Sequence, residues 1–250
     1  HYDRLEEEEQ LLYAEILKMR GLGQAALVSV GRTVLGTAGT LLGTSFLGYA
    51  LSKQEYWHRK IWYRYVVITM YFNAGIIPWF INMKNLGLTN SFWAYVIPAI
   101  VSPFSLILYK TYVENIPSSL EESAAMDGAG YLIRFTRIII PLSKPILATT
   151  AIFAAVGQWN SFTDTLFLMT DSTKFTLQYL LYEYMNEANS LADSLMKMSE
   201  SGVRVDMSSI LTATSVKMTV SMVVVLPILC VYPFFQRFFV NGIMIGSVKG

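Results

Sequence analysis

Five long apolar segments most constrain what this chain can fold into. An α-helix needs about 20 apolar residues to cross roughly 30 Å of hydrocarbon. Segments of that kind run over residues 22–51, 61–81, 92–112, 142–169 and 210–235. Of the 250 residues, 53% are hydrophobic and only 15% are charged, which is more apolar material than a water-soluble core of this size requires. We therefore expect an all-α, polytopic membrane protein, a single helical-bundle domain over residues 1–250 with five spans.

Small residues are concentrated in the first span, where glycines and threonines recur every three or four positions. Gly39 and Gly43 form one small-xxx-small pair within it. Because small side chains let membrane helices approach closely, the pattern predicts tight packing of another helix against this span.

The distribution of lysine and arginine predicts how the spans are oriented. Four basic residues lie in the loop 51–64, and four more lie in the connection after the third span. The turn 82–90 holds only Lys84, and the segment 170–207 carries three basic residues against six acidic ones. Since basic loops stay in the cytoplasm, we expect the chain to start outside, end inside and place the segment 170–207 outside.

A polar island, Glu122–Ala129, separates the third span from the fourth. Pro117 supplies a helix start, acidic residues follow in the first turn where the helix dipole favours them, and Gly128 and Gly130 stop or bend the helix. Within a cytoplasmic loop over 114–140 we therefore expect a helix, a bend and a second helical piece lying on the membrane surface. The many small side chains would let the first helix enter a partner's groove; an ordinary connecting loop is the alternative.

The sequence carries no signature of catalysis, metal binding or nucleic-acid binding. It has no glycine-rich phosphate loop, and His1, His58 and Cys230 offer no metal-ligand spacing. Glu122 and Asp127 are five residues apart, so on one helix they point in different directions and form no acid-base pair. A net charge of +1 with scattered basic residues disfavours nucleic acid as a partner.

The polar island resembles a known motif. Glu122–Ala129, followed by Ile138–Pro141, is similar to the EAA loop of binding-protein-dependent ABC importer permeases. The usual pattern is Glu-Ala-Ala, three residues to Gly, and an Ile-x-Leu-Pro ending. In this chain Ser123 replaces Ala and Ile140 replaces Leu, both small changes in size or polarity.

Further stretches resemble the carbohydrate, maltose-type branch of these permeases. They are Pro141–Ala148, Gln158–Asn160 and Gly246–Gly250. Within that branch, Arg32–Thr37 and Tyr49–Ser52 are most similar to permeases for complex oligosaccharides, including uronate-rich ones derived from alginate or pectin.

The resemblance implies a helical bundle of the type I ABC importer permease kind in the bacterial inner membrane, with the family's first helix before His1. It implies assembly with a homologous second permease as a heterodimer, with two ATPase subunits that bind ATP and Mg, and with a soluble extracytoplasmic binding protein. The chain itself would bind no cofactor and cleave no ATP. It would carry an oligosaccharide across the membrane lipid.

Two sets of contact residues follow from the resemblance. A coupling helix would meet the ATPase through Glu121, Glu122, Ser123, Ala124, Ala125, Asp127 and Gly128. The segment 170–207, with a helical stretch over 177–198, matches the family's outward scoop loop, so Tyr179, Tyr182 and Tyr184 would contact the binding protein.

Polar residues inside the spans allow two interpretations. They either line a translocation pathway that meets sugar hydroxyls or form hydrogen bonds between helices, and we favour the second interpretation. Such a hydrogen bond contributes roughly 1 kcal/mol or less. The residues are Asn73, Gln158, Trp159 and Asn160.

An ion-coupled secondary transporter and a membrane-embedded enzyme are the alternative functions. Asp164 is the one acidic residue within the predicted spans, which is fewer than ion coupling needs.

Overall fold

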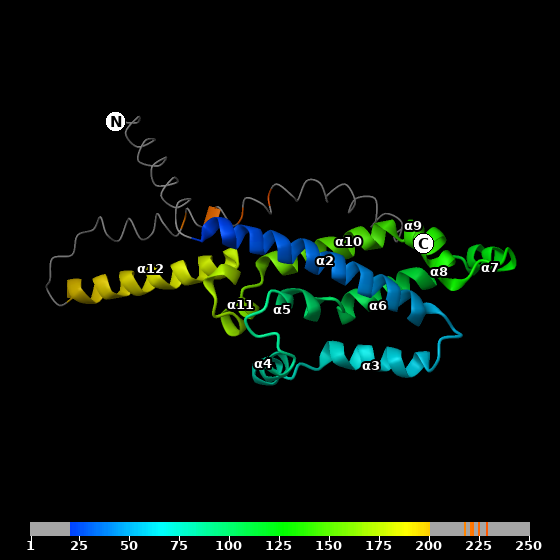
Figure 1. Cartoon of the computed structure of the whole chain (residues 1–250), viewed down its shortest axis with the longest axis horizontal. Helices are drawn as coiled ribbons and strands as arrows, with labels where there is room; N and C mark the ends of the chain where they lie inside the picture. The colour runs from blue at the N-terminus through cyan, green and yellow to red at the C-terminus, as the bar shows by residue number, and fades with distance from the viewer. Residues whose placement is uncertain (1–20, 201–217, 219–220, 223–224, 226–228, 230–250) are drawn as a thin grey trace, which may run out of the picture.

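The computed structural model describes residues 21–200 together with residues 218, 221, 222, 225 and 229. Most of the predicted fifth span, 210–235, lies outside the described residues. The elements from 21 to 200 are helical, which confirms the all-α class (Figure 1). They are α2 (Leu22–Ser52), α3 (Arg59–Tyr71), α4 (Ile76–Asn85), α5 (Trp93–Val96), η1 (Ile97–Ala99), α6 (Pro103–Glu114), α7 (Ser118–Met126), α8 (Tyr131–Arg134), η2 (Phe135–Ile139), α9 (Ile140–Leu142), α10 (Lys144–Asn160), α11 (Thr163–Leu168), η3 (Ser172–Lys174) and α12 (Leu177–Glu200).

Helix α2 is the axis of the bundle, and α6 and α10 pack along it (Figure 1). The small residues of α2 lie where these neighbours come closest. A Cβ atom added to Gly48 would sit 2.7 Å from the Tyr109 ring, and one added to Gly43 would collide with the carbonyl of Ile100. The expectation that small residues mark close helix packing is confirmed.

Among the described residues, α2 is the one helix long and apolar enough to cross a membrane by itself. Two bent helix pairs would raise the number of spans to three if each pair is counted as one span.

The prediction of one continuous helix over 61–81 is wrong. Helix α3 ends at Tyr71 and α4 begins at Ile76. Between them the Asn73 side chain accepts a hydrogen bond from the Gly75 amide (2.9 Å), and Gly75 takes a left-handed φ of 87° that only glycine adopts readily.

The predicted third and fourth spans also contain breaks. The span 92–112 is a pair of helices, Trp93–Ala99 and Pro103–Glu114, bent by 40°; Pro103 supplies no amide hydrogen to the preceding turn. The span 142–169 is helical only as far as Asn160, and α11 follows after two residues. At its other end α10 makes an angle of 78° with Tyr131–Leu142, as expected for a surface piece turning into a span.

Segments predicted for the same side of the membrane meet at the same end of the molecule. At the α7 end, Lys53 forms an ion pair with Glu121, which joins the two loops predicted to be cytoplasmic. At the α12 end, Ser29 accepts a hydrogen bond from the Leu177 amide (2.8 Å), and Asn90 accepts one from the Asp171 amide (3.2 Å).

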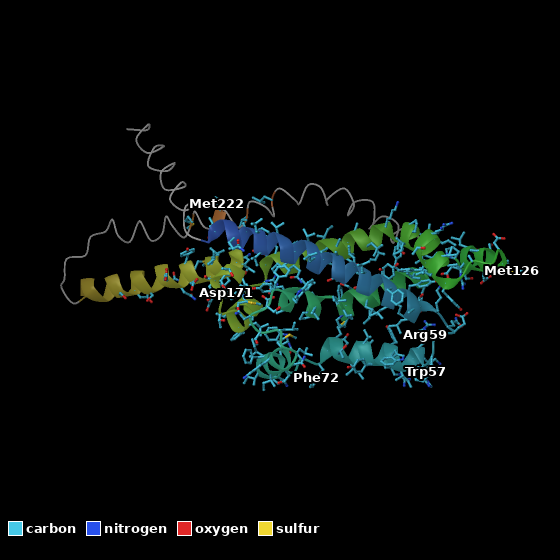
Figure 2. The ribbon with its side chains drawn as sticks, viewed as in Figure 1. Trp57, Arg59, Phe72, Met126, Asp171 and Met222 are labelled. Atoms are coloured by element: carbon cyan, nitrogen blue, oxygen red, sulfur yellow. The ribbon has the colours of Figure 1, made fainter. Side chains whose placement is uncertain are left out.

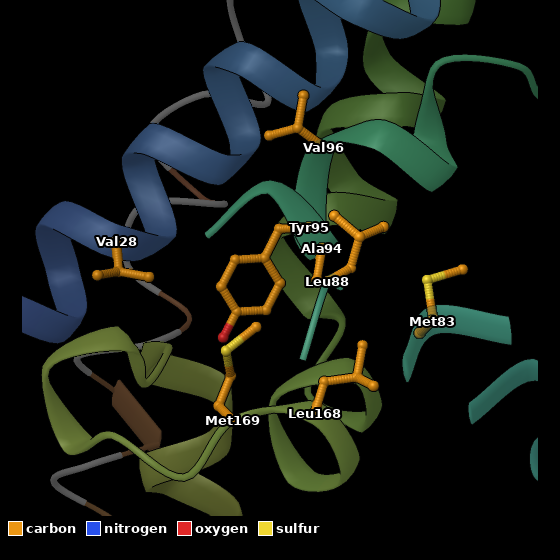
Figure 3. Close-up of a cluster of buried hydrophobic side chains, with 8 residues drawn as sticks. All are labelled: Val28, Met83, Leu88, Ala94, Tyr95, Val96, Leu168 and Met169. Carbon is orange, nitrogen blue, oxygen red and sulfur yellow. The ribbon is translucent and has the colours of Figure 1, made fainter. Parts of the chain in front are cut away.

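A core cluster of buried hydrophobic side chains joins α2, α4, α5 and α11 near the α12 end (Figure 3). It contains Val28, Met83, Leu88, Ala94, Tyr95, Val96, Leu168 and Met169.

Candidate functional site

The polar island folds as the sequence predicts, into a short helix, a bend and a second helical piece. Helix α7 ends in a paired cap: the Gly128 amide donates to the Ala125 carbonyl (3.0 Å) and the Ala129 amide donates to the Ala124 carbonyl (2.9 Å). This arrangement requires a left-handed residue after the helix, and Gly128 has a φ of 83°. The glycine of the motif is therefore needed for its backbone conformation, and it turns the chain toward α8.

Helix α7 forms the tip of the molecule at its end of the bundle, where Figure 2 labels Met126. The Met126 side chain is 89% exposed. Most of the residues predicted to contact an ATPase are exposed on the same short helix and its cap: Glu122, Ser123, Ala125, Asp127 and Gly128. Ala124 is half-buried. The helix thus presents a small, weakly acidic surface with no described residue covering it.

Glu121, the neighbour of these exposed residues, points into the protein and is buried. Its carboxylate accepts a hydrogen bond from the Tyr49 hydroxyl (3.1 Å) and forms an ion pair with Lys53. Tyr49 and Lys53 stand at the last turn of α2 and just after it, and the Lys53 ammonium lies 4.6 Å from the Tyr49 ring centre. We call Tyr49, Lys53 and Glu121 the α2–α7 clamp. It fastens the exposed helix to the longest span of the described chain.

Aromatic packing holds the second helical piece to the same end of α2. Phe135 opens a π-helical turn, η2, and its ring lies 5.1 Å from the Tyr49 ring and 6.1 Å from the Phe46 ring. Ile139, at the end of this turn, is fully buried. Both helical pieces of the motif are therefore packed against the same end of α2.

A second polar cluster lies among the spans around Arg32, the only charged residue of α2. The guanidinium binds Asp164 with two hydrogen bonds (2.6 and 3.1 Å), donates to the Ser161 carbonyl (3.0 Å) and donates through Nε to Gln158 (3.1 Å). It also lies 4.4 Å from the centre of the Tyr95 ring. Because Arg32 is 2% exposed, this is a buried ion pair within the bundle.

Sequence reasoning overlooked Arg32 as an intramembrane charge. The available signal is a single arginine with more than one helical turn of uncharged residues on each side, within a segment otherwise apolar enough to span a membrane. Its partner Asp164 is visible in the sequence, but the pairing joins residues 132 positions apart. Only the fold brings the two together.

The four residues predicted as pathway candidates do not meet at one site. Gln158 belongs to the Arg32 cluster and donates a second hydrogen bond to the Tyr95 carbonyl (3.1 Å). Trp159 packs instead against the apolar contact between α2 and α12. Asn160 accepts a hydrogen bond from Gln178 (2.9 Å) and is exposed, and Asn73 is exposed at the break between α3 and α4.

The helical stretch predicted over 177–198 within the outward segment is present, and α12 runs over Leu177–Glu200. Tyr179 packs edge-on against Phe175 with ring centres 4.6 Å apart, and Tyr182 stacks on Phe162 at 4.8 Å. Burial raises the pKa of the Tyr179 phenol and of the Tyr184 phenol. Tyr182 therefore joins the start of α12 to the segment after α10. Tyr179 and Tyr184 are half-buried.

A carboxylate fixes the chain just before α12. Hydrogen bonds from Lys174 and Thr173 lower the pKa of Asp171 to about 2. Because this pKa is depressed, the contribution of these bonds is present above the carboxyl's ordinary pKa and is lost only as the pH falls through about 2. The ionised Asp171 carboxylate thus holds the turn η3 that precedes α12.

Comparison with known proteins identifies the chain's relatives. Residues 37–245 match the family of binding-protein-dependent transport system inner membrane components. The chain belongs to this family. A member of this family is a translocation component of a transport system and not an enzyme, so this permease is expected to have no catalytic centre of its own.

Several relatives of this permease have curated descriptions that name saccharides. The polygalacturonan/rhamnogalacturonan transport system permease protein YtcP of Bacillus subtilis (strain 168) is 39% identical over 227 residues, 91% of this chain and 77% of the relative. The arabinooligosaccharides transport system permease protein AraQ of Halalkalibacterium halodurans is 30% identical, covering 91% of this chain and 73% of the relative.

A solved structure has the same fold as this permease. It is the crystal structure of a bacterial ABC transporter involved in the import of the acidic polysaccharide alginate. The two chains superpose with a TM-score of 0.77 at 30% identity, over 91% of this chain and 78% of the other. The fold described above is therefore that of an ABC importer permease.

Proposed function

We propose that this chain is the permease subunit of an ATP-driven importer whose cargo is an acidic oligosaccharide, and that α7 is the element through which ATPase movement reaches the spans. Two comparisons support an acidic cargo. The relative from Bacillus subtilis is described by polygalacturonan, a polymer of uronic acid units, and the solved structure is described by the acidic polysaccharide alginate.

The exposed surface of α7 supports its docking role. Glu122, Ser123 and Ala125 are exposed on a helix of nine residues that ends in a fixed cap. Small side chains keep the helix thin enough to enter a groove, and the α2–α7 clamp fastens it to the bundle. A displacement of α7 by a closing ATPase pair is therefore transmitted to α2 as rigid-body motion rather than absorbed by a loose loop.

The proposed assembly contains a second, homologous permease, two ATPase subunits and a soluble binding protein. ATP and Mg are bound by the ATPase subunits. In this assembly the α7 end faces the cytoplasm, as the basic residues of its loops favour, and the α12 end faces the binding protein. The side-by-side arrangement of the predicted cytoplasmic loops at one end, joined by Lys53 and Glu121, supports this orientation.

The docking role is tested by adding bulk to the exposed face of α7. Ala125→Trp is expected to abolish copurification of the ATPase subunits with the permease pair, because the added ring fills the space a groove needs. Gln54→Trp is the matched control, since Gln54 is exposed at the same end of the molecule but lies outside α7. An Ala125→Trp complex that keeps its ATPase and its sugar uptake would contradict docking at α7.

A further inference from the structure

A cavity of about 560 Å³ lies beside the Arg32 cluster, within the bundle formed by α2, α5, α6 and α10. This volume is in the range of small-molecule sites, roughly 300–1,000 Å³. Its walls combine aromatic rings with a few polar groups, the composition typical of such sites. The lining includes Arg32, Gln158 and Asp164 on one side and Trp79, Ser102 and Phe104 on the other.

Two breaks in the spans meet at this cavity. The first lies between η1 and α6 and contributes Val101 and Ser102; the second follows α10 and contributes Ser161. Irregular backbone at membrane depth occurs where it is buried in protein or lines a polar cavity, and interrupted helices mark substrate sites in other transporters. The convergence of both breaks on one space indicates a binding cavity rather than a packing defect.

The polar groups of the cavity suit a hydroxyl-bearing ring. Asp164 Oδ1 is already engaged by Arg32, Ser161 and the Thr165 amide, whereas Oδ2 receives one described hydrogen bond, from Arg32 (2.6 Å). A carboxylate oxygen accepts more than one hydrogen bond. Oδ2 can therefore accept a hydrogen bond from a sugar hydroxyl while the ion pair stays closed, and the aromatic walls offer an apolar surface to the face of the ring.

The electrostatic balance of the cavity accommodates an acidic sugar. Arg32 and Asp164 are the charged residues among its described lining, and they neutralise each other. The first turn of α6, which includes Phe104 and Ser105, faces the same space and carries the positive end of a helix dipole. The positive end of this dipole favours an anionic group in the cavity.

From this geometry we propose that the cavity is a subsite for one sugar ring of the transported oligosaccharide, with Asp164 accepting a hydroxyl hydrogen bond and Arg32 holding Asp164 in position. The proposal rests on the proposed transport function and extends it by placing a cargo contact within this subunit. It assigns Gln158 to holding Arg32, and it leaves Asn73, Trp159 and Asn160 outside the subsite.

Filling the cavity from its wall tests the proposal without disturbing the ion pair. Gly157 lines the cavity, and a Cβ atom built on it meets no atom within 4 Å, so Gly157→Leu projects into open space. Gly23→Leu is the matched control, since a Cβ on this helical glycine of α2 also meets nothing within 4 Å and Gly23 does not line the cavity. Both variants are assembled with the second permease and the ATPase and reconstituted in vesicles with the binding protein.

Two readouts separate the subsite from the transport function itself. With an oligogalacturonide as the probe, Gly157→Leu is expected to lower uptake at least tenfold while the ATPase activity without binding protein stays at the wild-type level. Gly23→Leu is expected to leave both unchanged. If the Gly157→Leu complex takes up the oligogalacturonide within twofold of the wild-type rate, the proposal of a sugar subsite is overturned. A wild-type complex that takes up no saccharide would instead refute the proposed function.

A second variant covers the case in which Gly157→Leu does not assemble. Ala154→Leu adds bulk one turn earlier on the same wall of the cavity, and the same loss of uptake with intact ATPase activity is expected. If neither variant assembles with its partners, the space is required for packing and the subsite is refuted.

Discussion

Tyr49 on α2 donates a hydrogen bond of 3.1 Å to Glu121 on α7, and Lys53 pairs with the same carboxylate. The two adjacent acidic residues of the motif therefore differ in role. Glu121 is directed into the bundle and holds α7 against α2, whereas Glu122 is exposed and available to a partner. A docking helix needs both properties, because a helix that docks without being fastened would move without moving the spans.

The first prediction concerns this clamp. Lys53→Glu places two carboxylates side by side in a partly buried site and is expected to destabilise the α2–α7 contact by about 1–3 kcal/mol. Sugar uptake should fall several-fold while the ATPase still copurifies, because the exposed face of α7 is unchanged. Uptake by reconstituted vesicles and copurification measure the two effects.

The charge-reversed pair provides the control for this prediction. Lys53→Glu combined with Glu121→Lys restores opposite charges across the contact and is expected to recover most of the uptake. Recovery distinguishes a lost contact from a nonspecific effect of a new acidic residue. Normal uptake by the single variant would show that the clamp does not participate in coupling.

The second prediction concerns the cap of α7. Gly128 has a φ of 83°, and an L-residue in this conformation costs roughly 1–2 kcal/mol. Gly128→Ala should therefore weaken ATPase copurification, and Gly128→Asn should weaken it less, since asparagine tolerates the left-handed region better. Gly130→Ala is the matched control: Gly130 has a φ of −67°, and its added Cβ meets nothing within 4 Å. Equal effects at the two glycines would argue against a conformational role for Gly128.

Hydropathy and turn chemistry predict some elements of this protein well. The first span, the bend after α7 and the helix over 177–198 appear where local sequence places them, because each depends on residues close together in the chain. The breaks at 72–75 and 161–162 are missed, since a hydropathy window sums side-chain polarity and is insensitive to the backbone. Gly75 is the local signal that a finer interpretation would use at the first of them.

The site is harder to predict than the fold, because its contacts are distant in sequence. Nothing local distinguishes Glu121 from Glu122; the difference arises because α2 brings Lys53 beside only one of them. The grouping of Asn73 with Gln158 fails for the same reason, since hydropathy locates polar residues in spans but does not say which helices meet. Arg32 illustrates the converse, a strong local signal whose meaning depends on Asp164.

The third prediction concerns the buried ion pair. Arg32→Met leaves the Asp164 carboxylate without its guanidinium partner and is expected to destabilise the bundle by about 3–5 kcal/mol. Arg32→Met with Asp164→Leu removes both charges and should recover much of that loss, because an apolar pair carries no desolvation penalty. Thermal unfolding of the purified permease in detergent measures both. A single variant as stable as wild type would refute the structural importance of the pair.

The fourth prediction concerns the exposed side of α12. Glu187 and Asp193 are exposed on this helix beyond Tyr182, which stacks on Phe162, so they are placed to meet a partner from outside. Glu187→Arg with Asp193→Arg should raise the binding-protein concentration needed for half-maximal ATPase stimulation, with a larger effect at low salt, because rim charges act mainly through association rate and are screened by ions. Glu55→Arg, an exposed charge reversal at the opposite end, should leave that concentration unchanged. If the double reversal has no effect at either salt concentration, α12 is not where the binding protein docks.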